Sequence, residues 1–419
     1  MAVLEFNITD PAFRSDPYPT YDHLRATDPV HYRPQRDDWV LTRHADVLRV
    51  LRDDRFGHPP LPPDPVGSAS GRAIGLGAAV FRRVHDRQRA RHLQLQWMLF
   101  HDPPKHTVLR SLFQDSFAPP QAEAWRETIE GLTDDLVASV AGREQVDVIL
   151  DLAYPLPAMV IAEVFGLPRR DWGRFREWTR ALVPALDEHA GTMGSESARQ
   201  ALLGFTEYFE DVIRQHRRQP QPGLFTVVLE AAGRAGLSDD ELIANVAFVF
   251  LAGQENVQHM IGNSLMALWD HPDQLRRLHD DPALLGSAVE ELTRFETSVQ
   301  LTSRQALTDV EIGGRSIRQG QTVLLSIGAA NRDPAKFDDP ATLDITRSPN
   351  AHLAFSSGPH YCLGAALARL EIRAMLGAIL RRYPGIHLTG PPPVRFDHFL
   401  VRGYRALPAA LGPLPAVSR

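Results

Sequence analysis

The chain has 419 residues, 43% hydrophobic and 23% charged, which is typical of a globular protein with a large buried core. Its 45 basic and 51 acidic residues give a formal net charge of -6, which excludes the overall basic field that attracts nucleic acid. A single cysteine excludes an internal disulfide and fits a reducing compartment.

The N-terminal segment contains no basic region followed by an apolar stretch, so the sequence predicts no secretory signal. The longest apolar run, from Leu242 to Ala252, is far shorter than the ~20 residues that span a bilayer. We therefore expect a soluble cytoplasmic protein that does not bind membranes.

Residues 30–42 (VHYRPQRDDWVLT) are predicted to form two short strands around a polar turn. Residues 57–100 begin with a run rich in Pro, Gly and Ser, and we expect this whole stretch to be an irregular lid over a substrate. Within it, residues 81–92 (FRRVHDRQRARH) contain five arginines. These arginines either form a solvated surface or meet an acidic substrate or carrier, and the sequence leaves both readings open.

Most of the remaining chain has helical patterns, including residues 121–140, 172–182 and 201–217. Residues 310–327 predict a second hairpin region. No fixed repeat or low-complexity linker divides the chain. The fold class expected from these patterns is mainly α with small β-sheets.

The clearest helix prediction covers residues 238–270, where Ser238 and Glu241 form a capping box. Its first half is apolar nearly all round, so it should be buried. Its middle contains Ala252-Gly253-Gln254-Glu255-Asn256. A helical Gly costs about 1 kcal/mol relative to Ala, and a buried carboxylate costs more unless it is paired. This composition favours a functional role for the segment.

The only cysteine, Cys362, lies in FSSGPHYCLG at the start of a predicted helix that extends to residue 380. Free N–H groups and the helix dipole stabilise a thiolate at such a position. Gly358 and Gly364 allow a sharp turn, and Phe355 can shield the sulfur from water. A zinc site normally needs four ligands and an iron–sulfur cluster needs several cysteines. An axial thiolate ligand of haem iron needs only one cysteine. The alternative for Cys362 is an inert buried thiol.

This loop resembles the haem-ligand loop of the cytochrome P-450 family, with matches at Phe355, Gly358, His360, Cys362 and Gly364. The resemblance implies that Cys362 is the axial ligand of haem iron within a haem-ligand loop and proximal helix at residues 355–380. It also implies a single prism-shaped haem-binding domain over residues 1–419, with haem b as the cofactor.

Other segments resemble the family in the same order along the chain. Glu291-Leu292-Thr293-Arg294 resembles its Glu-x-x-Arg motif, and Arg347 stands where the third partner of that network is found. A surface ion pair is the alternative for Glu291 and Arg294. The resemblance also assigns haem propionates to four cationic side chains: His106, Arg110, Arg304 and His360.

The family activity is a monooxygenase reaction, in which one atom of O₂ enters a substrate and the other leaves as water. The thiolate supplies electron density for O–O cleavage. We expect hydroxylation or epoxidation of a hydrophobic small molecule, such as a product of secondary metabolism. A haem-binding sensor or carrier without turnover is the least favoured alternative.

Ala252, Gly253 and Glu255 match the catalytic segment of the family's central distal helix, which here covers residues 238–270. Asn256 stands where a Thr hydroxyl usually orders water. An amide has separate donor and acceptor ends, so Asn256 either replaces the hydroxyl or indicates oxidative coupling or another unusual oxidation. Reduced or peroxide-driven activity is a further alternative, although Glu255 argues against the fatty-acid peroxygenase branch.

The resemblance to soluble bacterial members implies electron delivery by a ferredoxin and an NAD(P)H-dependent ferredoxin reductase to a monomeric enzyme. Arg369 and Arg373 either contact the ferredoxin or are plain solvated charges. By family position, the substrate pocket should use five apolar residues: Ala244, Phe248, Val299, Leu301 and Leu400.

Overall fold

The computed structural model describes residues 6–59, 78–183, 195–220, 223–396, 398 and 400–412. The chain forms two compact units. Unit 1 consists of Met1–Pro59, Ala122–Leu156 and Asn256–Arg419, and unit 2 consists of Pro60–Gln121 and Pro157–Glu255. The expectation of one domain over the whole chain stays a prediction.

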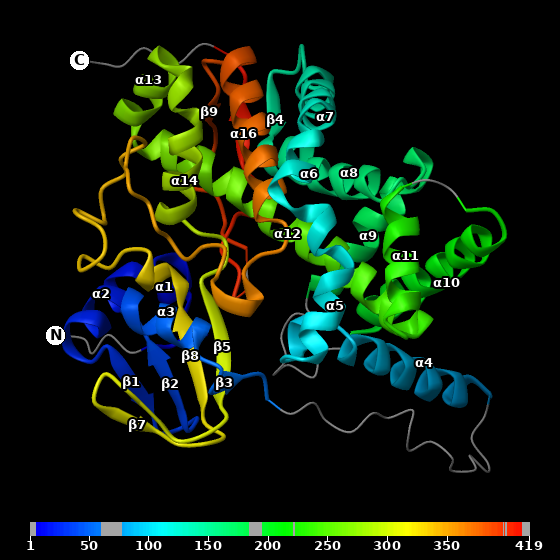
Figure 1. Cartoon of the computed structure of the whole chain (residues 1–419). Helices are drawn as coiled ribbons and strands as arrows, with labels where there is room; N and C mark the ends of the chain where they lie inside the picture. Colours follow the sequence, from blue (N-terminus) through cyan, green and yellow to red (C-terminus); the bar gives the residue numbers. More distant parts are fainter. Residues whose placement is uncertain are drawn as a thin grey trace. The chain divides into compact units, whose positions relative to one another are not determined.

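Unit 1 is built on a five-stranded sheet in the order β1-β2-β8-β5-β3 (Figure 1). These strands are β1 (Val30–Arg33), β2 (Asp38–Leu41), β3 (Phe56–Gly57), β5 (Leu301–Ala306) and β8 (Thr322–Ser326). The β2–β8 pair is parallel and the other pairs are antiparallel. The sheet thus joins strands that are far apart in the sequence.

Side chains alternate between the two faces of this sheet, as the strand period of 2 requires. Leu41, Val323 and Leu325 belong to one apolar cluster with α3 (His44–Arg52) and the hairpin of β6 (Val310–Ile312) and β7 (Arg315–Ile317). Val40 and Leu324 belong to a second cluster with α1 (Pro11–Ser15) and α2 (Tyr18–Thr27). The sheet is therefore covered on both faces.

Helices complete unit 1, and α16 packs against both α7 and α14. A second, smaller sheet has the order β4-β10-β9. These remaining elements are α7 (Arg126–Ser139), β4 (Gln145–Asp147), η3 (Val148–Ala153), α13 (Pro272–Asp280), η7 (Pro282–Leu284), α14 (Leu285–Phe295), α15 (Ile327–Ala330), η8 (Gly358–His360), α16 (Ala365–Arg382), β9 (His387–Leu388) and β10 (Pro408–Ala410).

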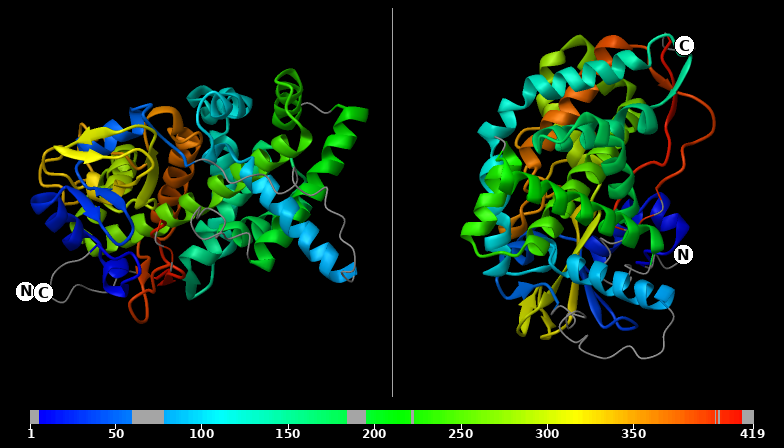
Figure 2. Two further views of the ribbon diagram at one scale, coloured as in Figure 1. Left: turned by 90° about the horizontal axis from the view of Figure 1, so that it is seen from below. Right: turned by 90° about the vertical axis from the view of Figure 1, so that its right-hand side faces the viewer.

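Unit 2 is helical, and none of its described residues forms a strand. Its elements are α4 (Ala78–Leu95), η1 (Met98–Phe100), α5 (Lys105–Gln114), η2 (Asp115–Phe117), η4 (Arg169–Asp171), α9 (Trp172–Leu182), α10 (Glu196–Arg218) and α11 (Leu224–Arg234). Helix α4, light blue in Figure 2, packs against α10. Three further helices contain residues of both units: α6 (Pro119–Ala124), α8 (Pro155–Val164) and α12 (Asp239–Asp270).

Helix α12 has 32 residues and starts at the predicted capping box. The Glu241 carboxylate accepts from the Ser238 backbone N–H at 2.8 Å, and the Ser238 hydroxyl accepts from the Glu241 N–H at 3.2 Å. Both hydrogen bonds satisfy N–H groups that a helix start leaves unpaired. The predicted helix 238–270 is confirmed.

Several other local predictions are confirmed. Residues 30–42 form the β1–β2 hairpin, residues 310–327 contain three strands, and α9 has the predicted bounds. The helix predicted at residues 121–140 is interrupted at Trp125, whose backbone N–H donates to the Ala122 carbonyl in a tighter turn. The overall class, mainly α with small sheets, is as expected.

The prediction that residues 57–100 are irregular was wrong for its second half, which forms α4 and η1. The Gly- and Pro-rich composition ends at Gly77, and the Arg, Gln, Ala and Leu residues that follow are good helix formers. Residues 60–77 lie outside the described residues.

Within the described part of the chain, every helix is too short or too polar to cross a bilayer.

Replacement of Ser238 by Ala should lower the free energy of unfolding by about 1 kcal/mol, because it removes the side-chain cap of α12. Chemical denaturation of the holoprotein measures this loss. Ser139→Ala is a matched control, since the Ser139 hydroxyl donates only to a carbonyl in an exposed last turn, and it should change stability by less than about 0.5 kcal/mol. Equal losses in the two variants would contradict a capping role.

Candidate functional site

The loop before α16 places Cys362 three residues ahead of an 18-residue helix. The Cys362 backbone N–H donates to the Phe355 carbonyl at 2.9 Å, and the Ala365 N–H donates to the Cys362 carbonyl at 3.4 Å. The cysteine is half-buried. Its sulfur therefore lies near the positive end of a helix dipole, which favours the thiolate.

Two glycines around the cysteine differ in why the loop needs them. Gly358 has φ +71°, and a Cβ there would clash with the Leu51 carbonyl oxygen at the end of α3. A Cβ on Gly364 would meet no atom within 4 Å. Open space thus adjoins Gly364, two residues after the cysteine. A group bound to the sulfur would have room beside this glycine, as haem ligation requires.

Phe355 is held in place by an ionic cluster on α14 and α16. The Arg369 guanidinium lies 4.2 Å from the Phe355 ring centre, and the His352 ring lies 5.9 Å away. Glu290 accepts two hydrogen bonds from Arg369, at 2.6 and 2.9 Å, and lies 3.2 Å from His352 Nε2. One carboxylate therefore fixes both groups that pack on the ring, and the ring belongs to the cysteine loop.

Burial raises the pKa of the Glu290 carboxyl, but hydrogen bonds from His352 and Arg369 outweigh burial and lower the pKa to about 2. The pKa of Arg369 is raised, because its bonds to Glu290 outweigh the opposing effect of burial. Both groups are therefore charged at neutral pH, and the pair is an ion pair.

The structure brings together the three residues of the expected Glu–Arg–Arg network. Arg294 donates to Glu291 at 2.7 and 2.8 Å, and both side chains are fully buried. Arg347 Nε lies 3.1 Å from each Glu291 oxygen, and the Asn350 amide donates at 3.1 Å. Arg294 also donates to three backbone carbonyls. This is a buried, well-satisfied network rather than the surface pair that was the alternative.

Two of the expected propionate partners lie in unit 1. Arg304 is 6% exposed on β5 and donates to the Ser303 carbonyl at 2.7 Å. The ring of His360 lies 4.7 Å from the ring of His58, a buried residue that directly follows β3. Sequence reasoning missed His58, and the only signal was a polar residue directly after a buried strand.

The other two expected partners lie in unit 2 on α5. His106 is 2% exposed and Arg110 is half-buried. Their spacing of four residues places them on one face of the helix. The buried position of His106 requires a polar surrounding, which fits a role in binding a charged group.

The expected catalytic residues lie in the middle of α12. Ala252 and Gly253 are half-buried, and Glu255 is 4% exposed. The Oδ1 atom of Asn256 is buried and accepts no hydrogen bond from any described residue. The neighbouring Gln254 accepts from the Thr179 hydroxyl. A buried amide oxygen without a partner is costly unless a group from outside the protein meets it.

Three of the expected pocket residues pack in apolar surroundings, and their place in a substrate pocket stays a prediction. Ala244 is fully buried, and Leu301 is 2% exposed in the apolar cluster between the large sheet and α1 and α2. Leu400 packs against the same cluster. Strand alternation turns Leu301 toward this core, so the structure supports a packing role for it. Phe248 is half-buried 5.6 Å from the Trp97 ring, and Val299 is half-buried.

Comparison with known proteins places these features in one family. A family model described as cytochrome P450 matches residues 189–402. The biotin biosynthesis cytochrome P450 of Bacillus subtilis is 35% identical over 384 residues, which cover 90% of this chain and 91% of that protein. The cytochrome P450 monooxygenase PikC of Streptomyces venezuelae is 34% identical over 418 residues, which cover 97% of this chain and 94% of that protein.

A solved structure agrees. The crystal structure of P450BioI in complex with an acyl carrier protein ligated to hexadec-9Z-enoic acid matches with a TM-score of 0.84 at 33% identity. The match covers 95% of this chain and 99% of that chain.

Replacement of Glu290 by Gln should lower the free energy of unfolding by roughly 1–2 kcal/mol at about pH 7, because Arg369 and His352 lose their anionic partner. The folded-state pKa of Glu290 is below its ordinary value of 4.5. The stabilisation is therefore present above that value and is lost as the pH falls toward about 2.

Urea denaturation at a series of pH values should show the wild type and the variant converging as the pH falls below about 4.5. Glu144→Gln, on an exposed turn before β4, is the matched control and should parallel the wild type. A constant difference between wild type and Glu290→Gln from neutral to acid pH would contradict the ion pair.

Proposed function

The chain belongs to the cytochrome P450 family, and from this premise we propose that it hydroxylates or epoxidises a hydrophobic natural product. It is a haem-thiolate monooxygenase with haem b as its cofactor. The observation that carries the proposal is the single thiol at the start of α16, beside the unfilled space at Gly364.

In the proposed assignment Cys362 is the ligand of the haem iron. In that role its negative charge would be stabilised by the α16 dipole, and Phe355 would shield it from water. His106, Arg110, Arg304 and His360 would neutralise the two propionates, since buried anions need cationic partners. When bound, haem supplies the activation of O₂. Phe355, whose ring is held by Arg369 and Glu290, would keep the thiolate in one position.

Asn256 and Glu255 are the proposed groups for proton delivery. The Asn256 side-chain oxygen, which has no partner among the described residues, can accept a hydrogen bond from a water or from a substrate hydroxyl. Glu255 precedes it on α12 and is also buried. The proposed role of Asn256 requires no threonine.

The proposed substrate is a mid-sized apolar molecule from a biosynthetic pathway. Relatives that match nearly the whole chain are described as acting in biotin biosynthesis and polyketide biosynthesis. A carrier-bound substrate would need free cations at residues 81–92. Arg89 is committed to Glu210 and Asp240, at 2.9 and 3.1 Å, and Arg91 to Gln94. Arg87 is exposed, and the side chains of residues 81–84 lie outside the described residues. Two of the three described arginines of this segment are thus engaged within the protein, which supports a free substrate.

Electrons would come from a ferredoxin and its NAD(P)H-dependent reductase, and we expect the enzyme to work in the cytoplasm as a monomer. Arg369 is engaged by Glu290 and Phe355. Arg373 is exposed one turn further along α16, so it is the better candidate for a ferredoxin contact.

A screen of apolar polyketides and fatty acids, free and attached to an acyl carrier protein, should give a haem spin-state absorbance shift with free compounds. A hit should then be oxidised in step with NAD(P)H consumption when ferredoxin and reductase are added. Shifts limited to carrier-bound compounds would overturn the free-substrate proposal. Binding without any turnover would favour a sensor or carrier.

Replacement of Asn256 by Thr or Ala should change how much NAD(P)H is diverted to hydrogen peroxide, because the variants alter the group that orders water. Gln258→Ala is the matched control, since residues two apart on a helix face different directions. Peroxide and product are measured together on the best substrate. If both Asn256 variants divide NAD(P)H between product and hydrogen peroxide as the parent does, this side chain has no part in oxygen activation.

A further inference from the structure

Asn245 lies in the first half of α12, and its side chain is completely buried. Its amide oxygen accepts from the Met98 backbone N–H at 2.7 Å. Its amide nitrogen donates to the backbone carbonyls of Gln96 and Glu241, both at 2.8 Å. The two donor hydrogens and the oxygen of the amide are therefore all paired with backbone groups. One side chain thus ties residues 96–98 to α12, and both parts belong to unit 2.

This contact fixes the first residue of the short helix η1. N–H groups at the start of a helix have no partner within that helix, and Asn245 supplies one for Met98 from another helix. Trp97, which precedes η1, is fully buried, and its ring lies 5.6 Å from the Phe248 ring on α12. Because η1 also packs against α5, the position of α5 depends on how η1 is held.

A second contact joins the start of α5 to the same part of α12. Lys105, the first residue of α5, forms an ion pair with the Glu241 carboxylate. Burial raises the pKa of Glu241, but hydrogen bonds with Lys105 and Ser238 outweigh burial and lower the pKa. Lys105 is 38% exposed, and exposed ion pairs contribute little to stability. The buried amide of Asn245 is therefore the stronger of the two attachments.

His106 directly follows Lys105 and is 2% exposed on α5. The proposed function assigns it, with Arg110, to a haem propionate. Hydrogen bonds weaken steeply when the donor leaves its favourable distance and angle, so this role requires α5 to be held in one position. Asn245 and Glu241 hold the chain directly ahead of His106.

We propose that Asn245 is a positioning residue for haem binding. By holding η1 on α12, it keeps α5 in the position in which His106 meets a haem propionate. It acts through His106, because its own amide is fully used by the backbone. The inference rests on the proposed function, which supplies the role of His106.

The test measures the rate at which the ferric holoenzyme loses haem to an excess of apomyoglobin. His106→Ala should lose haem about tenfold faster than the wild type, as expected for one lost hydrogen bond to a charged group. Asn245→Leu keeps the shape of the side chain but removes the amide, and it should lose haem roughly fivefold faster. The double variant should lose haem more slowly than the product of the two single effects, since one residue acts through the other.

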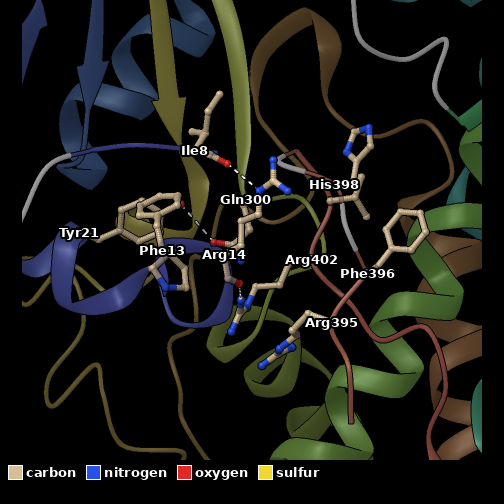
Figure 3. A pocket seen from close by; sticks show the side chains of 11 residues that line it. Ile8, Phe13, Arg14, Tyr21, Gln300, Arg395, Phe396, His398 and Arg402 are labelled. Carbon is tan, nitrogen blue, oxygen red and sulfur yellow. Dashed lines mark hydrogen bonds between the residues drawn. The ribbon is translucent and has the colours of Figure 1, made fainter. Parts of the chain in front are cut away.

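Asn263→Leu is the matched control. Asn263 is also completely buried on α12, and its amide donates to the carbonyls of Glu296 and Arg402, at 3.1 and 3.0 Å. Figure 3 shows Arg402 at a small pocket of unit 1 whose lining residues include none assigned to haem. Arg304, which is assigned to haem, is held separately by the pairing of β5 with β8. The control should therefore destabilise the fold, as Asn245→Leu does, and lose haem at the wild-type rate.

A milder pair of variants decides the question if Asn245→Leu does not fold with haem. Lys105→Met removes the second attachment of α5 and should lose haem about twofold faster than the wild type. Lys336→Met, at an exposed position, should match the wild type. Equal rates for Lys105→Met and the wild type would then overturn the proposal.

Three results with the asparagine variants would also overturn it: haem loss at the wild-type rate in Asn245→Leu, equal acceleration in Asn263→Leu, or effects of Asn245→Leu and His106→Ala that multiply in full. If His106→Ala itself loses haem as the wild type does, the propionate assignment of His106 fails and the positioning role fails with it. A red-shifted Soret band of the ferrous carbonyl would still support thiolate ligation in that case, so the two failures are distinguishable.

Discussion

The proposed haem ligation depends first on a cysteine held at the start of a helix. Cys362 lies at the positive end of α16, and its loop can take this course only because Gly358 has no Cβ to strike Leu51. The hydrogen bond from the Cys362 N–H to the Phe355 carbonyl closes the loop. Arg369, which is bound by Glu290, packs on the Phe355 ring and fixes it. Each of these contacts reduces the freedom of the Cys362 loop, which is what the proposed role as a metal ligand requires.

Three carboxylates, two in the second half of α14 and one directly after it, bind cations in different parts of unit 1. Glu290 binds the cations that hold the cysteine loop, and Glu291 binds Arg294 and Arg347 in the core. Glu296 binds Arg402, which in turn holds the end of α1. Three carboxylates of one short segment therefore connect parts of the chain that are far apart in the sequence. The buried pairs of Glu291 and Glu296 hold these parts of the chain in fixed positions.

Local features were the ones that the sequence predicted well. The β1–β2 hairpin, α9 and the cap of α12 follow from patterns within a few residues, and the cysteine loop was recognised from its own motif. The parallel pairing of β2 with β8, and the meeting of His58 with His360, join residues about 300 positions apart. No local pattern records such contacts. For the same reason the cluster of cations around Glu296 and the packing of Leu301 against α1 and α2 gave no signal in the sequence.

The absorption spectrum of the reduced enzyme under carbon monoxide tests the central claim most directly. Thiolate ligation by Cys362 predicts a Soret band strongly shifted to the red, which disappears in Cys362→Ser even where that variant still takes up haem. An unshifted band in the wild type, or a red-shifted band that survives in Cys362→Ser, would contradict this account.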